Sequence, residues 1–268
     1  MLAKNLHIVF IAATAVLFVS CKTKEYARVQ KSQNLQDRYS YAQKMYDNGD
    51  YKKALHLYED IQSYMKGREN FEDMTFQMAY SYYYTKDYFM AATVFQNYTR
   101  LFPTNRRVEE AFYMAALSTM LDASYYKLDQ SQSKEAIKLF QLFVNYYPKS
   151  DRVKEANAHI DQLRERIGKK YFELADNYLK RGLYNSADIA YRGVIKDYSE
   201  TSYREKAMYK DIIALYKYAD NSIEAKQTQR FKDAISAYET FERSYPESSY
   251  LKDALKYKEL AQKKLSKK

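Results

Sequence analysis

The sequence predicts an all-α protein built as a stack of antiparallel helix pairs. Three observations lead to this prediction: the prolines recur in one short phrase, alanines recur with an aromatic residue one helical turn later, and loop-forming residues are scarce. The 268 residues include only 5 glycines and 3 prolines, and 46% of them are hydrophobic. This composition supplies a sizeable core and little material for the turns of a sheet protein.

All three prolines occupy the same place in a phrase made of an aromatic residue, proline, any residue and a small polar residue. Pro103, Pro148 and Pro246 lie in the phrases FPTN, YPKS and YPES, and residues 198–201 (YSET) repeat the phrase without its proline. Proline ends a helix because it lacks an N–H and clashes with the preceding turn, and the small polar residue can cap the next helix. The phrase therefore predicts a helix end followed closely by a helix start.

An alanine followed four positions later by an aromatic residue occurs once in each of five repeats. The pairs are Ala54 and Tyr58, Ala91 and Phe95, Ala136 and Phe140, Ala187 and Tyr191, and Ala234 and Tyr238. Residues four apart share one face of a helix, so the small residue lets a second helix approach while the ring fills the space beside it. The spacing between successive alanines, 37 to 51 residues, sets the length of one repeat.

A tight turn between the two helices of a repeat is marked by glycine. Gly49 and Gly182 stand at the start of this turn, and Lys86 takes the same place in the second repeat. Glycine suits the position because a turn directly after a helix needs a positive φ. Four repeats also have an aromatic residue three positions before the repeat alanine: Tyr51, Tyr88, Tyr184 and Phe231.

The third and fifth repeats carry insertions between their two helices. In these repeats the small residues of the two helices are twenty positions apart, from Ala116 to Ala136 and from Ala214 to Ala234, where the other repeats have twelve. The extra residues lie around 124–133 and 219–229. They form either a longer first helix or a longer loop, and the sequence leaves both possibilities open.

The pattern of small residues, aromatic residues and prolines resembles the tetratricopeptide repeat, whose unit of two antiparallel helices is about 34 residues long. The resemblance implies a solenoid of about five helix pairs between residues 34 and 250, followed by a basic C-terminal helix. In such arrays the first helices of the pairs line a concave surface that binds extended segments or partner domains.

We expect eight residues of the first two repeats to line this groove, from their helical spacing relative to the small residue of each first helix. They are Tyr39, Gln43, Tyr46, Asp47, Phe76, Tyr80, Tyr83 and Tyr84. Exposed aromatic residues at helical spacing favour a partner peptide that is rich in aromatic residues or extended. The alternative, that individual rings face the neighbouring repeat, stays open.

The charge pattern and the placement of histidines favour a protein without catalytic chemistry. The formal net charge is +10, but basic residues alternate with acidic ones, which is typical of solvated helix surfaces. The three histidines, His7, His56 and His159, are isolated, and no cluster of histidine, cysteine and carboxylate residues has metal-ligand spacing. We therefore expect no enzymatic activity, no cofactor, no metal ion and no nucleic-acid partner.

The beginning of the chain resembles the export signal of a bacterial lipoprotein. Lys4 precedes an apolar run at residues 8–19, which is too short to span a membrane, and Cys21, the only cysteine, follows it. Residues 17–21 (LFVSC) resemble a lipobox, which implies cleavage before Cys21 and lipid attachment to its thiol. We expect a signal peptide at residues 1–20 and a lipidated tether at residues 21–33. An ordinary signal peptide followed by a chance cysteine is the alternative.

A lipoprotein of this size with five such repeats resembles the BamD family of the outer-membrane β-barrel assembly machinery. The irregular third repeat, the YSET phrase and the basic final helix belong to this resemblance. Two stretches carry most of it: residues 140–150 (FQLFVNYYPKS) and residues 163–178 (LRERIGKKYFELADNY).

The resemblance implies a non-catalytic subunit held by its lipid on the periplasmic face of the outer membrane. Residues 34–168 would hold unfolded outer-membrane proteins in their groove, and residues 169–268 would dock on the periplasmic domain of the barrel insertase (BamA-like). The implied partners are therefore the insertase, unfolded barrel precursors and the membrane. A general scaffold lipoprotein that organises peptidoglycan or other envelope machinery is the alternative, because a fold does not fix a function.

Overall fold

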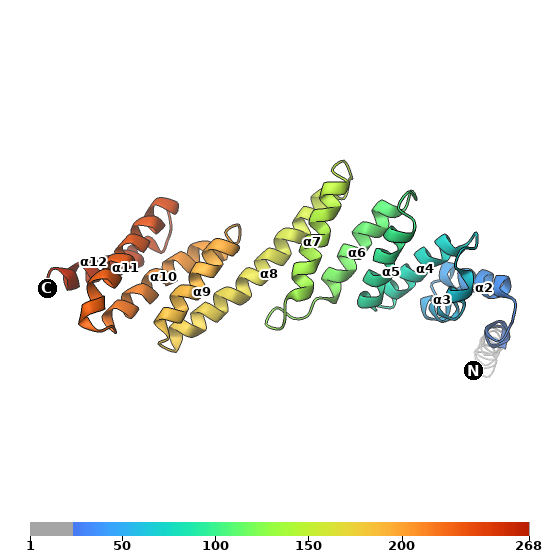
Figure 1. The fold of residues 1–268 in the computed structure, drawn as a ribbon, viewed down its shortest axis with the longest axis horizontal. Coiled ribbons are helices and arrows are strands. Elements are labelled where there is room, and N and C mark those ends of the chain that lie inside the picture. Colours follow the sequence, from blue (N-terminus) through green and yellow to red (C-terminus); the bar gives the residue numbers. More distant parts are fainter. Residues whose placement is uncertain (1–23, 268) are drawn as a thin grey trace, which may run out of the picture. The chain divides into compact units, whose positions relative to one another are not determined.

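The computed structural model describes residues 24–267, and all its regular elements within this range are helices (Figure 1). They divide into two compact units, with the division between Asp122 and Ala123. Within each unit, consecutive helices pack on one another. The predicted all-α array of helix pairs is confirmed.

The first unit contains α2 (Leu35–Asp47), α3 (Tyr51–Met65), α4 (Phe71–Tyr84), α5 (Tyr88–Leu101) and α6 (Val108–Asp122). Its core is built on the repeat residues, because Ala54, Tyr58, Ala91 and Phe95 are all 0% exposed. Each alanine lies where a neighbouring helix approaches closely, and the ring one turn later fills the adjoining space.

The second unit contains α7 (Ser131–Tyr146), α8 (Val153–Lys180), α9 (Tyr184–Asp197), α10 (Tyr203–Asp220), α11 (Glu224–Ser244) and α12 (Leu251–Leu265). The same repeat residues form its core. Ala136, Phe140, Ala187, Tyr191 and Ala234 are 0% exposed, and Tyr238 is 3% exposed. One packing rule therefore operates in both units.

The turns inside three repeats have the positive φ that the sequence predicts. The angle is +78° at Gly49, +67° at Lys86 and +76° at Gly182. The residue after each of them donates its N–H to the carbonyl five positions earlier, as Asp50 does to Met45 at 2.8 Å. This hydrogen bond closes the end of the first helix. Among residues 24–267, Lys86 is the one residue other than glycine with a positive φ.

The proline phrases end a helix as predicted, but their small polar residues do not cap the next helix directly. α5 ends at Leu101, before Pro103, and α6 begins only at Val108. Asn105 holds the turn between them, because its side-chain oxygen accepts a hydrogen bond from the N–H of Arg107 at 2.8 Å. The serines of the other two proline phrases accept from the N–H two positions later in the same way.

The two insertions take different forms. In the third repeat the extra residues form a loop, at residues 123–130, before α7 begins. In the fifth repeat they lengthen the helices, since α10 has 18 residues, α11 has 21, and only residues 221–223 separate them. By comparison, α4 and α5 have 14 residues each.

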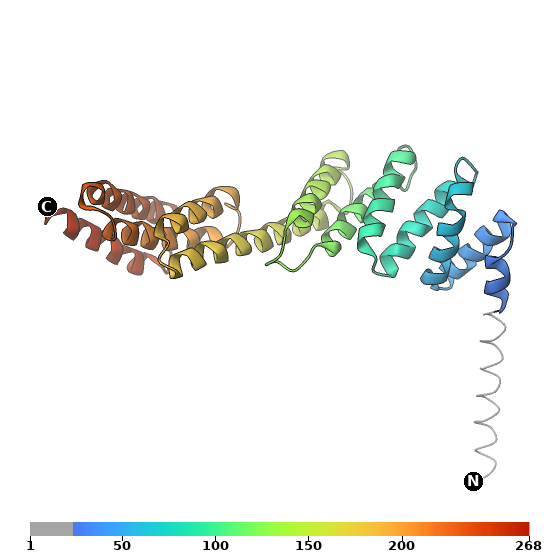
Figure 2. The same ribbon diagram turned by 60° about the horizontal axis from the view of Figure 1, so that its bottom comes forward.

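The division expected between residues 168 and 169 falls inside a continuous helix. α8 has 28 residues and packs against α7 as well as α9 (Figure 2, yellow). Gly168 does not break this helix. A Cβ atom at Gly168 would lie 3.1 Å from Oγ1 of Thr201, so the missing side chain allows a close approach. The chain divides into its two compact units between Asp122 and Ala123.

The tether expected at residues 21–33 is partly folded in the structure. Residues 24–30 are helical, and Val29 is buried. The ring centroid of Tyr26 lies 6.3 Å from that of Tyr41, so this segment packs on α2. The predicted signal peptide and the predicted lipid attachment site, Cys21, lie outside the described residues.

The strain at Lys86 gives a testable prediction. Replacing a residue in the left-handed region by glycine removes a clash worth about 1 kcal/mol, so Lys86→Gly should raise the free energy of unfolding by roughly that amount. The matched control is Gly49→Ala, which should lower it by a similar amount, because no other atom lies within 4 Å of the added Cβ and the cost is purely conformational. Urea unfolding measures both changes. A loss of stability in Lys86→Gly would contradict the assigned turn.

Candidate functional site

A continuous row of aromatic rings crosses the first unit on α2, α3 and α4. We call it the aromatic ladder: Tyr46, Tyr51, Tyr84, Tyr80 and Phe76. Adjacent ring centroids lie 5.5, 4.3, 5.7 and 5.2 Å apart in that order. The pairs in the middle of the row are stacked and those at its ends meet edge to face, which are the two geometries that aromatic rings favour.

The structure brings most of the predicted groove residues to this ladder. Tyr46, Phe76, Tyr80 and Tyr84 belong to it, and the ring of Tyr83 lies 5.7 Å from that of Tyr84. Tyr84 is the most accessible of them, with 48% of its surface exposed. A partly covered row of rings presents both apolar faces and phenol groups to a partner.

The remaining three predicted residues contribute differently. Tyr39 is only 4% exposed, so it packs inside the unit and offers no ring to a partner; for this residue the expectation of a groove position is wrong. It lies on the side of α2 that faces the core. Gln43 is half-buried, and Asp47 is exposed at the end of the same helix.

Several residues that contact the ladder could not be predicted from helical spacing. Arg107 places its guanidinium carbon 5.1 Å from the ring centroid of Phe76, and it forms ion pairs with Asp73 at 2.5 Å and Glu72 at 3.5 Å. The hydroxyl of Tyr80 donates to Glu110 on α6. Contacts with charged groups thus fix the positions of the Phe76 and Tyr80 rings. Helical spacing predicts none of these contacts, because each joins α4 to a residue at least 30 positions later in the chain.

Burial raises the pKa of phenol groups in and beside the ladder. Burial, together with the neighbouring Tyr84 and Tyr51, raises the pKa of Tyr46 well above the ordinary value of 10.0. Burial also raises the pKa of Tyr98, whose hydroxyl donates to Glu72. Neutral phenols keep the surface apolar while leaving hydrogen-bond donors at its edge.

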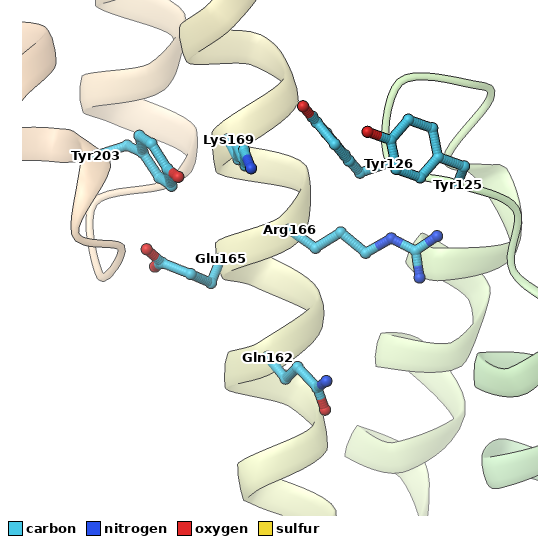
Figure 3. Close-up of a pocket in the computed structure, with 7 residues that line it drawn as sticks. All are labelled: Tyr125, Tyr126, Gln162, Glu165, Arg166, Lys169 and Tyr203. Atoms are coloured by element: carbon cyan, nitrogen blue, oxygen red, sulfur yellow. The ribbon is translucent and has the colours of Figure 1, made fainter.

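A pocket in the second unit lies along α8 and is shown in Figure 3. Gln162, Glu165, Arg166 and Lys169 come from successive turns of α8, between Tyr203 on one side and the two tyrosines of the 123–130 loop on the other. The lining residues are Tyr125, Tyr126, Gln162, Glu165, Arg166, Lys169 and Tyr203.

The charged side chains of this pocket contact the segments that form it. Arg166 donates to the carbonyl of Ala123 at 3.2 Å, and the ammonium of Lys169 lies 4.5 Å from the ring centroid of Tyr126. Glu165 accepts the N–H of Ser202 at 3.0 Å. The pocket therefore fixes the insertion loop of the third repeat and the start of α10 to α8, which gives these residues a structural task.

Within residues 24–267 there is no group of three or more histidine, cysteine, aspartate or glutamate side chains placed to hold a metal ion. A search of the same part of the chain finds no helix that is both long and apolar enough to cross a membrane. The described residues therefore define a class of protein: a helical-repeat array with an aromatic surface and, within residues 24–267, no assembled metal centre.

Comparison with known proteins identifies the family. A family profile described as "YfiO: Outer membrane lipoprotein" matches residues 31–228, and the chain belongs to this family. It is 25% identical over 209 residues to the outer membrane protein assembly factor BamD of Pasteurella multocida (strain Pm70), covering 74% of this chain and 79% of that one. It is 24% identical over 237 residues to the BamD of Neisseria meningitidis serogroup B (strain MC58), covering 84% and 85%.

The buried phenols predict how stability depends on pH. The folded-state pKa values of Tyr46, Tyr58 and Tyr98 lie above the ordinary 10.0. Their contribution to the free energy of unfolding is therefore complete below pH 10.0, and it is lost as the pH rises further. We expect a group of the 31 tyrosines to ionise only when the protein unfolds in alkali. Tyrosinate absorbance, followed in buffer and in denaturant, measures this. Identical titration curves in the two solvents would contradict the prediction.

Proposed function

We infer that the protein is a non-catalytic outer membrane protein assembly factor that holds unfolded barrel precursors. Two observations support this proposal. The chain belongs to a family of outer membrane lipoproteins, and its BamD relatives carry the name of assembly factors. The observation that carries the precursor-binding step is the aromatic ladder of the first unit.

The ladder suits an extended and partly apolar chain. Unfolded strands present alternate side chains to one face, and those of a membrane barrel alternate apolar with polar residues. Aromatic or branched side chains of such a strand would lie on the exposed rings of Tyr84 and its neighbours. The phenol hydroxyls would accept or donate hydrogen bonds at the edge. Holding a precursor in this way covers an apolar segment that otherwise aggregates.

The second unit would dock on the periplasmic domain of a barrel insertase, through residues 169–268. Because the two tasks fall on different parts of one chain, a precursor bound by the first unit would stay at a raised effective concentration beside the insertase. Lipid attached to Cys21 would hold the whole protein at the outer membrane, since two or three acyl chains anchor stably.

A general envelope scaffold is the alternative function, because helical repeats also organise assemblies that never contact barrel precursors. The presence of an exposed aromatic surface favours precursor binding. A scaffold that contacts only folded partners has no need for a row of rings that suits extended chains.

A matched pair of tyrosine variants tests the proposal. Tyr84→Ala removes the most exposed ring of the ladder, and we expect it to weaken binding of a urea-unfolded outer-membrane barrel protein about tenfold. Tyr64→Ala is the control, because Tyr64 is 63% exposed on α3 and belongs to no ring pair described for the ladder. Binding is measured by fluorescence anisotropy of the labelled precursor after dilution from urea.

Equal effects of the two substitutions would overturn the role of the ladder, since general stickiness of exposed tyrosines would then explain the binding. Loss of the stacked Tyr84 ring should lower the unfolding temperature somewhat, but both variants should still unfold cooperatively and well above the assay temperature, which separates loss of binding from loss of fold.

A further inference from the structure

The second unit contains a groove on a different surface from the pocket of Figure 3. α10 forms its floor, and α9 and α11 form its two sides, enclosing a volume of about 440 Å³. Its floor residues Met208 and Leu215 are 8% and 5% exposed. Ile195 on α9 and Ala237 on α11 add further apolar surface to the sides.

A buried carboxyl group lies in the middle of this apolar floor. Asp211 lines the groove and is 5% exposed, and its Oδ1 accepts no hydrogen bond from any N–H or hydroxyl group in the described part of the chain. Burial and the adjacent carboxyl group of Asp188 raise the pKa of Asp211 well above its usual range. Two carboxyl groups can lie this close in the free protein when they share one proton.

The side chains around this pair leave the groove acidic. On α9, Asp188 forms an ion pair with Arg192 at 2.6 Å, and the side chain of Arg192 is 60% exposed. On α11, Asp233 lines the opposite side and accepts a hydrogen bond from the side-chain amide of Gln229 at 2.9 Å. The carboxyl groups of Asp211 and Asp233 therefore line the groove with one guanidinium group, and the carboxyl group of Asp188 lies next to that of Asp211.

A comparable groove in the first unit shows that a buried carboxylate is not a requirement of the repeat. There α4 lies between α3 and α5, and the buried polar residue on the floor is Thr75. Its hydroxyl donates to the carbonyl of Phe71 at 2.7 Å and needs no outside partner. A hydroxyl of this kind satisfies itself within the helix, whereas the carboxyl group of Asp211 does not.

We propose that the groove between α9 and α11 is a docking site for an arginine side chain of a protein partner. The aliphatic part of the arginine lies along Met208, Leu215 and Ile195. When its guanidinium group enters, the proton shared by Asp211 and Asp188 is released to the solvent, and the guanidinium group pairs with the two carboxylates. The guanidinium fork suits two adjacent carboxylates better than a lysine ammonium, because it donates several hydrogen bonds in fixed directions.

This inference deepens the proposed docking role of the second unit and rests on it. It specifies that the partner presents an arginine with apolar neighbours. The net charge of +10 alone would predict a partner with an acidic surface. A volume of about 440 Å³ fits one anchoring side chain in a larger interface.

A pair of peptides tests the inference on the full chain. The first is acetyl-Ala-Leu-Arg-Leu-Ala-amide, and the second carries citrulline, an uncharged group of nearly the same shape, in place of arginine. We expect the arginine peptide to shift the methyl NMR signals of Met208 and Ala237 and to bind about tenfold more tightly than the citrulline peptide.

Variants locate the effect. Asp211→Asn keeps the size of the side chain and removes its charge, so it should abolish the preference for arginine over citrulline. Asp161→Asn, an exposed aspartate of α8, is the matched control and should leave the preference unchanged. Equal affinity of the two peptides for the parent protein, or a preference that survives Asp211→Asn, would overturn the inference.

Failure of this inference can be told apart from failure of the docking role. Recovery of an outer-membrane barrel protein with the full chain from gently solubilised envelopes tests docking as such. If the barrel protein is recovered and the peptides bind equally, the arginine site is wrong and docking stands. If the arginine peptide is preferred and no barrel protein is recovered, the proposed docking role on which the inference rests is overturned.

Discussion

The close approach of helices at the repeat alanines is the constraint on which the rest of the structure depends. An alanine without exposed surface, followed one turn later by a buried ring, recurs from Ala54 and Tyr58 to Ala234 and Tyr238. A larger side chain at any of these alanines would force the helices apart, and the ring beside it would lose its contacts. The functional surfaces inherit their geometry from this packing, because α4 and α10 are fixed between their neighbours by it.

The same demand for aromatic residues supplies the candidate binding surface. Rings such as Phe95 and Tyr58 fill the core, and the rings of the aromatic ladder continue this packing outward until Tyr84 is half exposed. A partner strand that adds its own side chains to the ladder would extend contacts that the fold already makes. The acidic groove of the second unit follows the opposite principle, since Asp211 interrupts an apolar floor and gains a full set of partners only from outside.

Periodicity predicts the core well and the surfaces less well. The repeat alanines, their aromatic partners and the turn residues Gly49, Lys86 and Gly182 could be assigned from the sequence, because each obeys a steric rule within one or two helical turns. Helical spacing also found four members of the ladder, but it misplaced Tyr39, whose ring turns toward the core. Contacts between side chains of different elements, such as Arg107 with Phe76 or Asp211 with Asp188, cannot be predicted from helical spacing. The form of the insertions was also open: residues 123–130 form a loop, whereas the insertion of the fifth repeat extends its helices.

Hydrogen–deuterium exchange of the full chain, with and without an unfolded outer-membrane barrel protein, tests the central claim most directly. The claim is that the first unit holds extended precursor chains on the aromatic ladder. The account predicts that the precursor slows exchange in α2, α3 and α4, where the ladder lies, and leaves α9 to α11 unchanged. Protection confined to α9, α10 and α11, with none around Tyr84, would contradict it.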